Sequence, residues 1–341
     1  MELSDRIFGV MDRGNVDGAS VRQNSKNILH LPKPIEQLAS ESGIAVNGLK
    51  KRLSTIRRAL FEAREKRVHP AKDDKILTDW NGLIIAALAR ASQVLGEEEY
   101  LLAAVKTADF FLEKILEKNG TLYHRFVKGE RAVEGFLDDY AFLAWGLTEI
   151  YEASFDDRFL QTASKLTDIM ITRFWDEKEG GFFFSARNSA DIVAKRKEVY
   201  DGALPSGNSV AMLNLLRLSR LTDNTGYETM ARRMSRTFAA EVKESPLAHS
   251  FLLLGVDFAL GPVYNVTLVG DLNDEGLLNL LKTLRVSYFP RMVVSLKPAG
   301  KAGLGYEQIE GKATAYVCRD QTCLPPMNKP LEMLKLFDEN I

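Results

Sequence analysis

The sequence of 341 residues contains only two cysteines, Cys318 and Cys323. So few cysteines exclude a disulfide-stabilised scaffold and predict a reducing compartment, the cytoplasm. Their spacing is neither a CxxC redox motif nor, without a second ligand pair, a zinc site, so we interpret the pair as structural or incidental. No apolar run approaches the ~20 residues that cross a bilayer. The charged residues within Met1–Asn15 argue against a signal peptide, so we expect no membrane association.

A charge excess of either sign is also absent. The chain has 45 lysines and arginines against 46 aspartates and glutamates, a formal net charge of −1. Without a basic excess we expect no nucleic-acid partner. Walker, GxGxxG, HExxH and GxSxG motifs are missing, which disfavours nucleotide-dependent and standard serine-hydrolase chemistry. We therefore predict no cofactor and no metal.

What the chain does have is an internal repeat of paired helices. Three uncharged runs of nine residues are typical of helices buried on all sides: they span 81–89 (NGLIIAALA), 140–148 (YAFLAWGLT) and 208–216 (NSVAMLNLL). Each run is followed, after a short polar turn, by a segment that is apolar on one face only. The pattern predicts inner helices alternating with outer helices.

These pairs predict a mainly α fold, a partial (α/α) toroid of helix hairpins with a small carboxy-terminal α/β appendage. We place the toroid portion at 34–261, after an extended amino-terminal segment at 1–33. Beyond Gly261 and Pro262, short β-branched runs surround one helix, which is typical of a small α/β unit. The appendage is therefore expected at 262–341.

In such a toroid the inner helices run parallel, so their amino ends open on one rim. Unpaired N–H groups and helix dipoles favour polar and anionic groups there. The sequence places Asp79, Trp80 and Asn81 at the first such end, Asp138, Asp139 and Tyr140 at the second, and Asp201, Ser206 and Asn208 at the third. Loops that return to the same rim carry His124, Arg125, Phe183 and Arg196.

Two interpretations of this rim stay open. Polar residues at helix starts are ordinary N-caps, worth ~1 kcal/mol each. A cap needs only one polar side chain, however, whereas Asp138 and Asp139 are adjacent and Asp79 precedes Trp80, a ring that could stack on a sugar. In a pocket we expect Asp138 or Asp139 to act as acid or base, Asp79 as second carboxylate and Arg125 as oxyanion support.

Several of these residues also have an ordinary structural interpretation. Trp80 and Tyr140 sit beside apolar runs, where aromatic rings more often belong to the core. A lone loop histidine such as His124 is more often a surface residue than a catalyst, although its pKa suits proton transfer.

Six stretches resemble a known family. They are 27–31 (NILHL), 73–83 (DDKILTDWNGL), 136–142 (FLDDYAF), 180–183 (GGFF), 200–209 (YDGALPSGNS), and 315–318 with Cys323. In this order they resemble the thioredoxin-domain-containing family typified by spermatogenesis-associated protein 20, over about its carboxy-terminal half. The resemblance implies part of a six-hairpin toroid, similar to N-acylglucosamine 2-epimerases and six-hairpin glycosidases.

The rim and the resemblance together predict a carbohydrate-active-like module that binds, epimerises or hydrolyses a sugar, with enzymatic activity left open. The alternative is a non-catalytic scaffold that docks a thioredoxin-like domain or a partner chain supplying the rest of the ring. Inner helices that are apolar on every face need neighbours on both sides, so an incomplete ring favours such a partner or self-association. A thiol-redox function is disfavoured because the chain lacks CxxC.

Overall fold

The structure is a computed structural model that describes residues 3–15, 26–188, 195–300, 305–320 and 322–338. The chain divides into two compact units, Met1–Asp73 and Asp74–Ile341. The first contains helices α1 (Leu3–Ile7), α2 (Ile35–Ser42) and α3 (Val46–Glu65), with a small core built around Ile7, Leu38, Leu49 and Leu53.

This division differs from the boundary expected near residue 33. Helix α1 lies in the segment expected to be extended, and residues 1–2 and 16–25 of that segment lie outside the described residues. Leu38, Leu49 and Leu53, assigned above to the toroid, pack with Ile7 and Phe8. Residues on both sides of position 33 share this small apolar cluster, so the first unit extends to Asp73 although 34–65 has a helical pattern like that of the ring.

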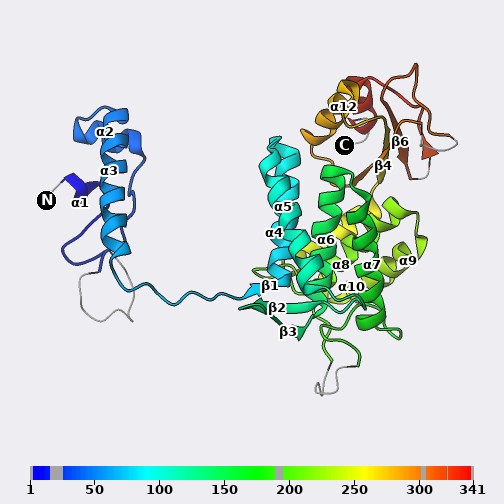
Figure 1. The fold of residues 1–341 in the computed structure, drawn as a ribbon, viewed down its shortest axis with the longest axis horizontal. Coiled ribbons are helices and arrows are strands. Elements are labelled where there is room, and N and C mark those ends of the chain that lie inside the picture. Colours follow the sequence, from blue (N-terminus) through cyan, green and yellow to red (C-terminus); the bar gives the residue numbers. More distant parts are fainter. Residues whose placement is uncertain (1–2, 16–25, 189–194, 301–304, 321, 339–341) are drawn as a thin grey trace. The chain divides into compact units, whose positions relative to one another are not determined.

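The second unit is built from helix hairpins (Figure 1). Four inner helices neighbour one another in chain order: α4 (Thr78–Leu95), α6 (Leu137–Ser154), α8 (Gly207–Thr222) and α11 (Ser250–Leu260). The outer helices that follow the first three are α5 (Glu98–Phe110), α7 (Asp157–Phe174) and α9 (Thr225–Thr237). The shorter elements are η1 (Phe111–Ile115), α10 (Ala239–Glu244) and η2 (Pro246–His249). The predicted fold class, a partial (α/α) toroid, is confirmed.

Close packing of α4 against α6 depends on two glycines. A Cβ atom on Gly82 would lie 2.5 Å from the carbonyl carbon of Phe142, and one on Gly146 would lie 2.9 Å from the carbonyl oxygen of Gly82. The missing side chains let the two backbones touch. Outer helix α7, in contrast, buries a single stripe that includes Phe159, Leu166 and Phe174, as its one-sided pattern predicts.

A three-stranded antiparallel sheet lies at the end of the ring where the inner helices begin. Strands β1 (Ile76–Leu77), β2 (Tyr123–Val127) and β3 (Glu130–Glu134) are ordered β1-β2-β3, with Leu77 opposite Arg125. The hydroxyl of Thr78 donates to the carbonyl of Tyr123 at 2.5 Å. Strand β2 is thereby fixed against the first turn of α4.

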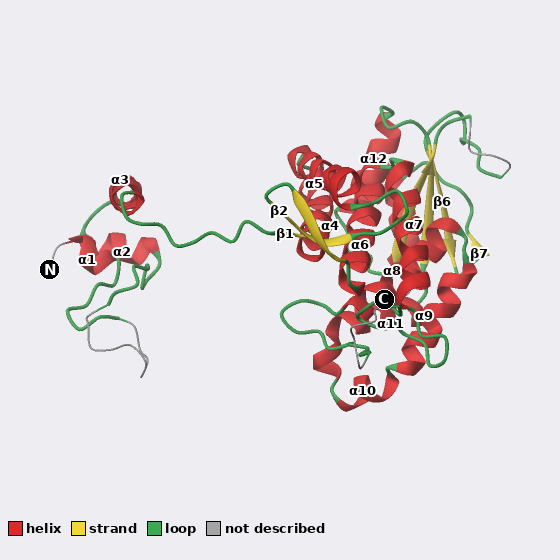
Figure 2. Cartoon of the chain, turned by 60° about the horizontal axis from the view of Figure 1, so that its bottom comes forward, coloured by secondary structure: helices red, strands yellow, loops and turns green. Residues whose placement is uncertain are grey.

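The appendage lies at the opposite end of the helices (Figure 1), and its strands are yellow in Figure 2. Its four-stranded sheet has the order β5-β4-β6-β7, with β4 and β5 parallel and the other neighbours antiparallel. The elements are β4 (Tyr264–Val269), α12 (Glu275–Arg285), β5 (Met292–Lys297), β6 (Thr314–Arg319), β7 (Thr322–Cys323) and α13 (Pro330–Asp338). Val266, Leu268, Leu280 and Phe337 form its own core.

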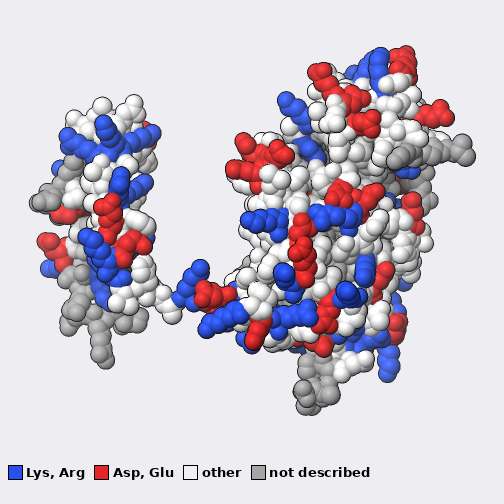
Figure 3. Space-filling model, in the orientation of Figure 1, with Lys and Arg blue, Asp and Glu red and all other residues white. Residues whose placement is uncertain are grey.

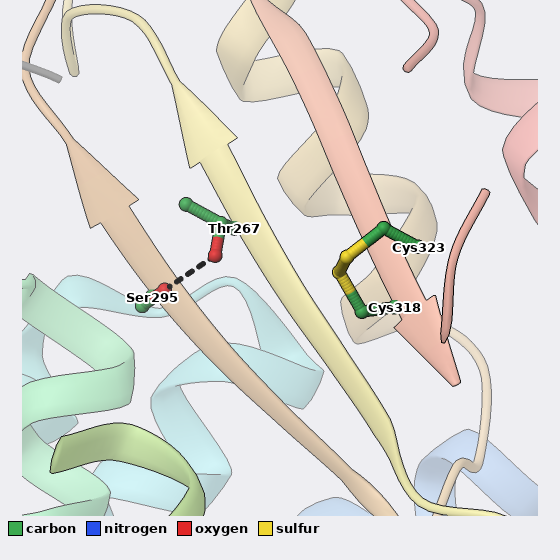
Figure 4. Close-up of a disulfide and its surroundings, with 4 residues drawn as sticks. All are labelled: Thr267, Ser295, Cys318 and Cys323. Atoms are coloured by element: carbon green, nitrogen blue, oxygen red, sulfur yellow. Dashed lines mark hydrogen bonds between the residues drawn. A yellow bond between two sulfur atoms is a disulfide. The ribbon is translucent and has the colours of Figure 1, made fainter. Parts of the chain in front are cut away.

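The other face of this sheet carries polar residues beside Val293, which packs into the core of the ring. Alternation along the strands puts Thr267 and Ser295 on it, their hydroxyl oxygens 3.2 Å apart (Figure 4). Cys318 and Cys323 pair across β6 and β7 and form a disulfide. The two cysteines therefore take the structural role among the interpretations that their spacing left open.

The surface matches the balanced composition. Basic and acidic side chains are interspersed over the face shown in Figure 3, consistent with a net charge near zero. Among the described residues, no helix combines the length and the apolarity that crossing a bilayer requires.

Candidate functional site

The rim formed by the starts of α4, α6 and α8 carries a buried carboxylate, Asp139. Its Oδ1 accepts the backbone N–H of Asp79 at 3.0 Å, and its Oδ2 accepts that of Phe136 at 2.8 Å. Asp139 is fully buried and, at the third position of α6, accepts the N–H of the N-cap residue Phe136. One side chain thus joins the first turns of two inner helices.

The same carboxylate holds His124 on strand β2. The Nδ1 atom of His124 lies 3.0 Å from Oδ1 and 3.1 Å from Oδ2 of Asp139. With Nδ1 donating to Asp139, Nε2 is the ring nitrogen left for a ligand. The hydrogen bond to Asp139 raises the pKa of His124, and burial opposes it. The imidazole side chain is 25% exposed, so it is oriented and still accessible.

Asp138 stands beside this pair with a strongly altered acidity. Burial, followed by the neighbouring carboxylates of Asp139, Asp79 and Glu198, raises the pKa of Asp138 to about 7. A hydrogen bond from the backbone N–H of Gly207, at the start of α8, opposes that rise. A carboxyl group that titrates near neutrality is suited to exchanging protons with a ligand at physiological pH.

Asp79 completes the acidic group on the first turn of α4. Burial, and then the charge of Asp139, raises its pKa. Its Oδ1 accepts the backbone N–H of Trp80 at 2.8 Å, and the Trp80 residue is 59% exposed. Trp80 is therefore a surface ring beside the carboxylates, whereas the core placement was the expectation for an isolated residue.

A pocket of about 200 Å³ opens next to Asp138. Its wall combines polar, aromatic and small residues: Leu137, Asp138, Phe184, Glu198, Tyr200, Gly202, Leu204, Pro205, Ser206 and Gly207. Tyr200 is 60% exposed at its edge. The ring of Phe184 stacks on Phe136, with centroids 4.9 Å apart, and Phe136 contacts the ring of His124. These stacked rings link the pocket wall to the histidine.

Asp79, His124 and Asp139 also have the spacing of a metal site, because one ligand atom from each lies within 4.8 Å of the others. The Asp139 oxygens, however, already accept two backbone N–H groups and the histidine ring. Donors aimed at a carboxylate repel a cation and compete for its lone pairs. The arrangement therefore favours an internal hydrogen-bond network over a metal centre.

Three of the predicted rim residues make hydrogen bonds that fix loops and helix starts. Asp201 accepts the N–H groups of Ser206, Phe251 and Leu252, which ties the start of α11 to the start of α8. Asn208 is fully buried and binds both backbone groups of Phe182. Ser206 caps α8 through Ser209, although it also lines the pocket.

Arg125, predicted as oxyanion support, follows His124 on β2, so the two side chains point to opposite faces of the sheet. Its Nε atom is buried and has no hydrogen-bond partner among the described residues, and the oxyanion role stays a prediction. Tyr140 lies in the core, where its hydroxyl accepts the N–H of Leu122 at 2.9 Å and a hydrogen bond from Arg173. That placement agrees with the core interpretation.

The remaining candidates lie at the edge of the site. Asn81 donates to the carbonyl of Leu77 within its own turn. Arg196 is largely exposed and pairs with Glu198, a pocket residue. The ring of Phe183 faces the ammonium of Lys197. Sequence reasoning overlooked Tyr200, Phe136 and Phe184, although Tyr200 and Phe136 lie within stretches that carry the family resemblance.

No family model matches the chain. Among curated proteins, it is 28% identical over 99% of its length to spermatogenesis-associated protein 20 of Rattus norvegicus, and 29% identical over 98% to that of Homo sapiens. The predicted resemblance is confirmed. An uncharacterised Caenorhabditis elegans protein is 30% identical over 97% of the chain. The chain spans about half the length of these relatives, 46% of the rat and human proteins and 48% of the nematode protein.

Among solved structures, similar ones include cellobiose 2-epimerase from Bacillus thermoamylovorans, with a TM-score of 0.43 and 17% identity over 50% of this chain and 46% of that one. A GH76 alpha-mannanase of Bacteroides thetaiotaomicron gives a TM-score of 0.42 and 18% identity over 51% and 47%. A D-mannose isomerase gives 0.40 and 16% over 48% and 42%.

Proposed function

We propose that the rim site binds a sugar and transfers a proton on it, with Asp138 as general acid and His124 as general base. One observation carries this proposal: the adjacent residues Asp138 and Asp139 of α6 have different environments and different partners. Asp139 is buried and orients His124 through Nδ1, whereas Asp138 forms part of a pocket wall. Two proton-exchanging groups with separate environments are what general acid and base catalysis requires.

The lining of the pocket supports a sugar as the ligand. Its volume of about 200 Å³ suits a single ring better than a drug-sized molecule. Glu198 and Ser206 offer acceptors and a donor for hydroxyl groups. Tyr200 and Trp80 are both more than half exposed, and such rings can cover the apolar face of a sugar.

This proposal changes the roles that the sequence suggested. Asp139 has acceptors that are already occupied, so it becomes a positioning residue. Asp138 takes the acid role, His124 replaces Arg125 as the second polar partner, and Asp79 remains a second carboxylate in the same electrostatic group.

The experiment combines binding and proton exchange. Mono- and disaccharides are screened against the full chain by ligand-observed NMR, and bound sugars are then incubated in D2O. Loss of a carbon-bound proton signal indicates epimerisation or isomerisation, whereas new anomeric signals indicate hydrolysis.

Matched variants make the test specific. Asp138→Asn and His124→Gln should abolish turnover and retain the fold. Asp157→Asn changes a first-turn aspartate of outer helix α7 and should leave turnover unchanged. Wild-type protein that binds and converts none of the sugars would contradict the proposal.

A separate observation favours the scaffold function. Helix α4 leaves four large apolar residues exposed: Trp80 at 59%, Ile84 at 49%, Val94 at 53% and Leu95 at 61%. They form one pair near each end of the helix, and exposed apolar residues of this size mark interaction surfaces when they gather on one face. We propose that this face docks a partner chain with a complementary apolar helix, supplying further ring helices.

Light scattering after size-exclusion chromatography tests the scaffold function. Docking is supported if the wild type associates, Ile84→Glu does not, and Asp138→Asn still does. A wild-type protein that stays monomeric contradicts it.

A further inference from the structure

A second polar cluster lies at the other end of the ring, where α4, α6 and α8 meet the appendage. Arg217 of α8 is buried and pairs with Glu149, at 2.5 Å, and with Glu152, both buried on α6. Arg217 binds one carboxylate oxygen of Glu152, and the other, Oε1, accepts the backbone N–H of Val294 on β5 at 3.1 Å. The charges of Glu149 and Glu152 are therefore committed to partners.

Two more guanidinium groups face this cluster without a carboxylate of their own. Arg285 of α12 donates to the carbonyls of Glu152 and Ala153, at 3.3 and 2.8 Å. Within the described part of the chain, Arg90 of α4 makes no hydrogen bond or ion pair, although its charge acts on Glu149, Glu152 and Arg285. Three guanidinium groups thus face two carboxylates, and the one in excess, Arg90, belongs to a residue that is exposed at the edge of the cluster.

A small cavity of about 30 Å³, partly open to solvent, lies between these groups. Arg90, Gln93, Glu152, Arg285 and Ser287 supply its polar wall, and apolar residues of α12 and β5 supply the rest. The Nε2 atom of Gln93 is buried and has no acceptor among the described residues. Buried donors without an acceptor are rare in native structures, so this one calls for a missing partner.

We propose that this junction cavity binds a small monoanion of the size of chloride, held by Arg90, Arg285 and the amide of Gln93. A monoanion would accept from the unpaired donors and cancel the excess positive charge. The volume exceeds the space that one water needs and is too small for a sugar. Glu149, whose Oε2 lacks a donor, does not line the cavity.

Electrostatics around Arg285 agree with an anion. Burial lowers the pKa of Arg285, the charge of Glu152 opposes that fall, and the charge of Arg90 adds to it. A bound anion would favour the charged guanidinium and raise the pKa of Arg285 again. Because its donors come from both α4 and α12, the anion would fasten the appendage to the ring.

The experiment measures thermal unfolding of the full chain while sodium chloride replaces sodium gluconate at constant ionic strength. Gluconate is too large for the cavity. We expect the melting temperature to rise with chloride and to saturate at millimolar concentrations, with matching broadening of the 35Cl NMR signal. Arg90→Gln and Gln93→Leu should each raise the chloride concentration at half-saturation by about tenfold, since each removes one donor to the anion.

The matched control is Arg291→Gln. Arg291 pairs with Asp257, at 2.6 Å, elsewhere on the same junction, so this variant should melt lower and keep the chloride response. Equal melting in chloride and gluconate, or saturation only at molar chloride, would mean that water alone fills the cavity and would overturn the proposal. An unchanged response in both Arg90→Gln and Gln93→Leu would overturn it as well.

Discussion

His124 and Asp139, which are 15 positions apart, lie 3.0 Å from each other across the start of helix α6. Two backbone N–H groups complete the shell of Asp139, so the histidine is fixed by a carboxylate that cannot itself reach a ligand. The chemistry of the rim depends on this relationship.

Replacing Asp139 by Asn should both destabilise the fold and release His124. Loss of a buried charged acceptor with three donors should lower the free energy of unfolding by about 2–4 kcal/mol. The pKa of His124 should fall toward its ordinary value, because the hydrogen bond to Asp139 is the largest cause of its rise. Chemical denaturation and NMR titration measure both effects. In the control Asp156→Asn, an exposed N-cap of α7, the histidine should titrate as in the wild type.

Asp138 should make stability depend on pH. Its pKa rises from 3.8 in the unfolded chain to about 7 in the folded protein, so the folded state keeps a proton that the unfolded state releases. The stabilising contribution is complete below pH 4 and is lost as the pH rises through 7, by up to about 4 kcal/mol. The raised pKa of His124 acts with the same sign above pH 6.5. As the pH rises from about 4 to about 8, the unfolding free energy of the wild type should fall relative to that of Asp138→Asn, because the neutral amide resembles the protonated carboxyl at every pH. A difference that does not change with pH would contradict this prediction.

Gly207 should tolerate no side chain. A Cβ atom there would lie 2.2 Å from Oδ1 of Asp138, so Gly207→Ala must displace the carboxyl group and weaken any ligand that depends on it. We expect at least a tenfold loss of sugar affinity, which isothermal calorimetry measures. Gly48→Ala, where the nearest atom is 3.4 Å away, is the control and should leave affinity intact.

Tyr200 should contribute to binding and little to folding. The residue is 60% exposed and lies at the edge of the pocket. Tyr200→Ala should weaken sugar binding several-fold, through loss of ring contact, and change unfolding free energy by less than about 0.5 kcal/mol. A melting temperature that falls sharply in this variant would show that the ring serves the fold instead.

Removing the disulfide should affect the appendage alone. Cys318 and Cys323 enclose a short loop, with a sequence separation of 5, so the unfolded chain loses little entropy through the bond. Cys318→Ser with Cys323→Ser should cost about 2 kcal/mol. Hydrogen exchange should rise in β6 and β7 and stay unchanged in α6. Faster exchange throughout the ring would contradict this local role.

The helical hairpins could be predicted from the sequence because burial on all sides leaves a visible signature. The inner helices α4, α6 and α8 are buried on all sides and carry uncharged runs, whereas the outer helix α7 is apolar on one face only. The helical period therefore predicts from the sequence which faces of each helix are buried. The strands of the appendage were predictable for a similar reason, since β-branched residues cluster in them. The boundary at Asp73 was not, because it depends on which apolar cluster Leu38 and Leu49 join.

The candidate site was likewise predictable in part. The sequence alone determined that carboxylates collect at the starts of the inner helices, since helix ends are fixed by local pattern and capping. Only the tertiary structure decided that Asp139 is an orienting residue, that His124 faces it, and that Arg125 turns away. Those outcomes depend on the register of β2 against β1 and on contacts between residues far apart in the chain, which local periodicity does not encode.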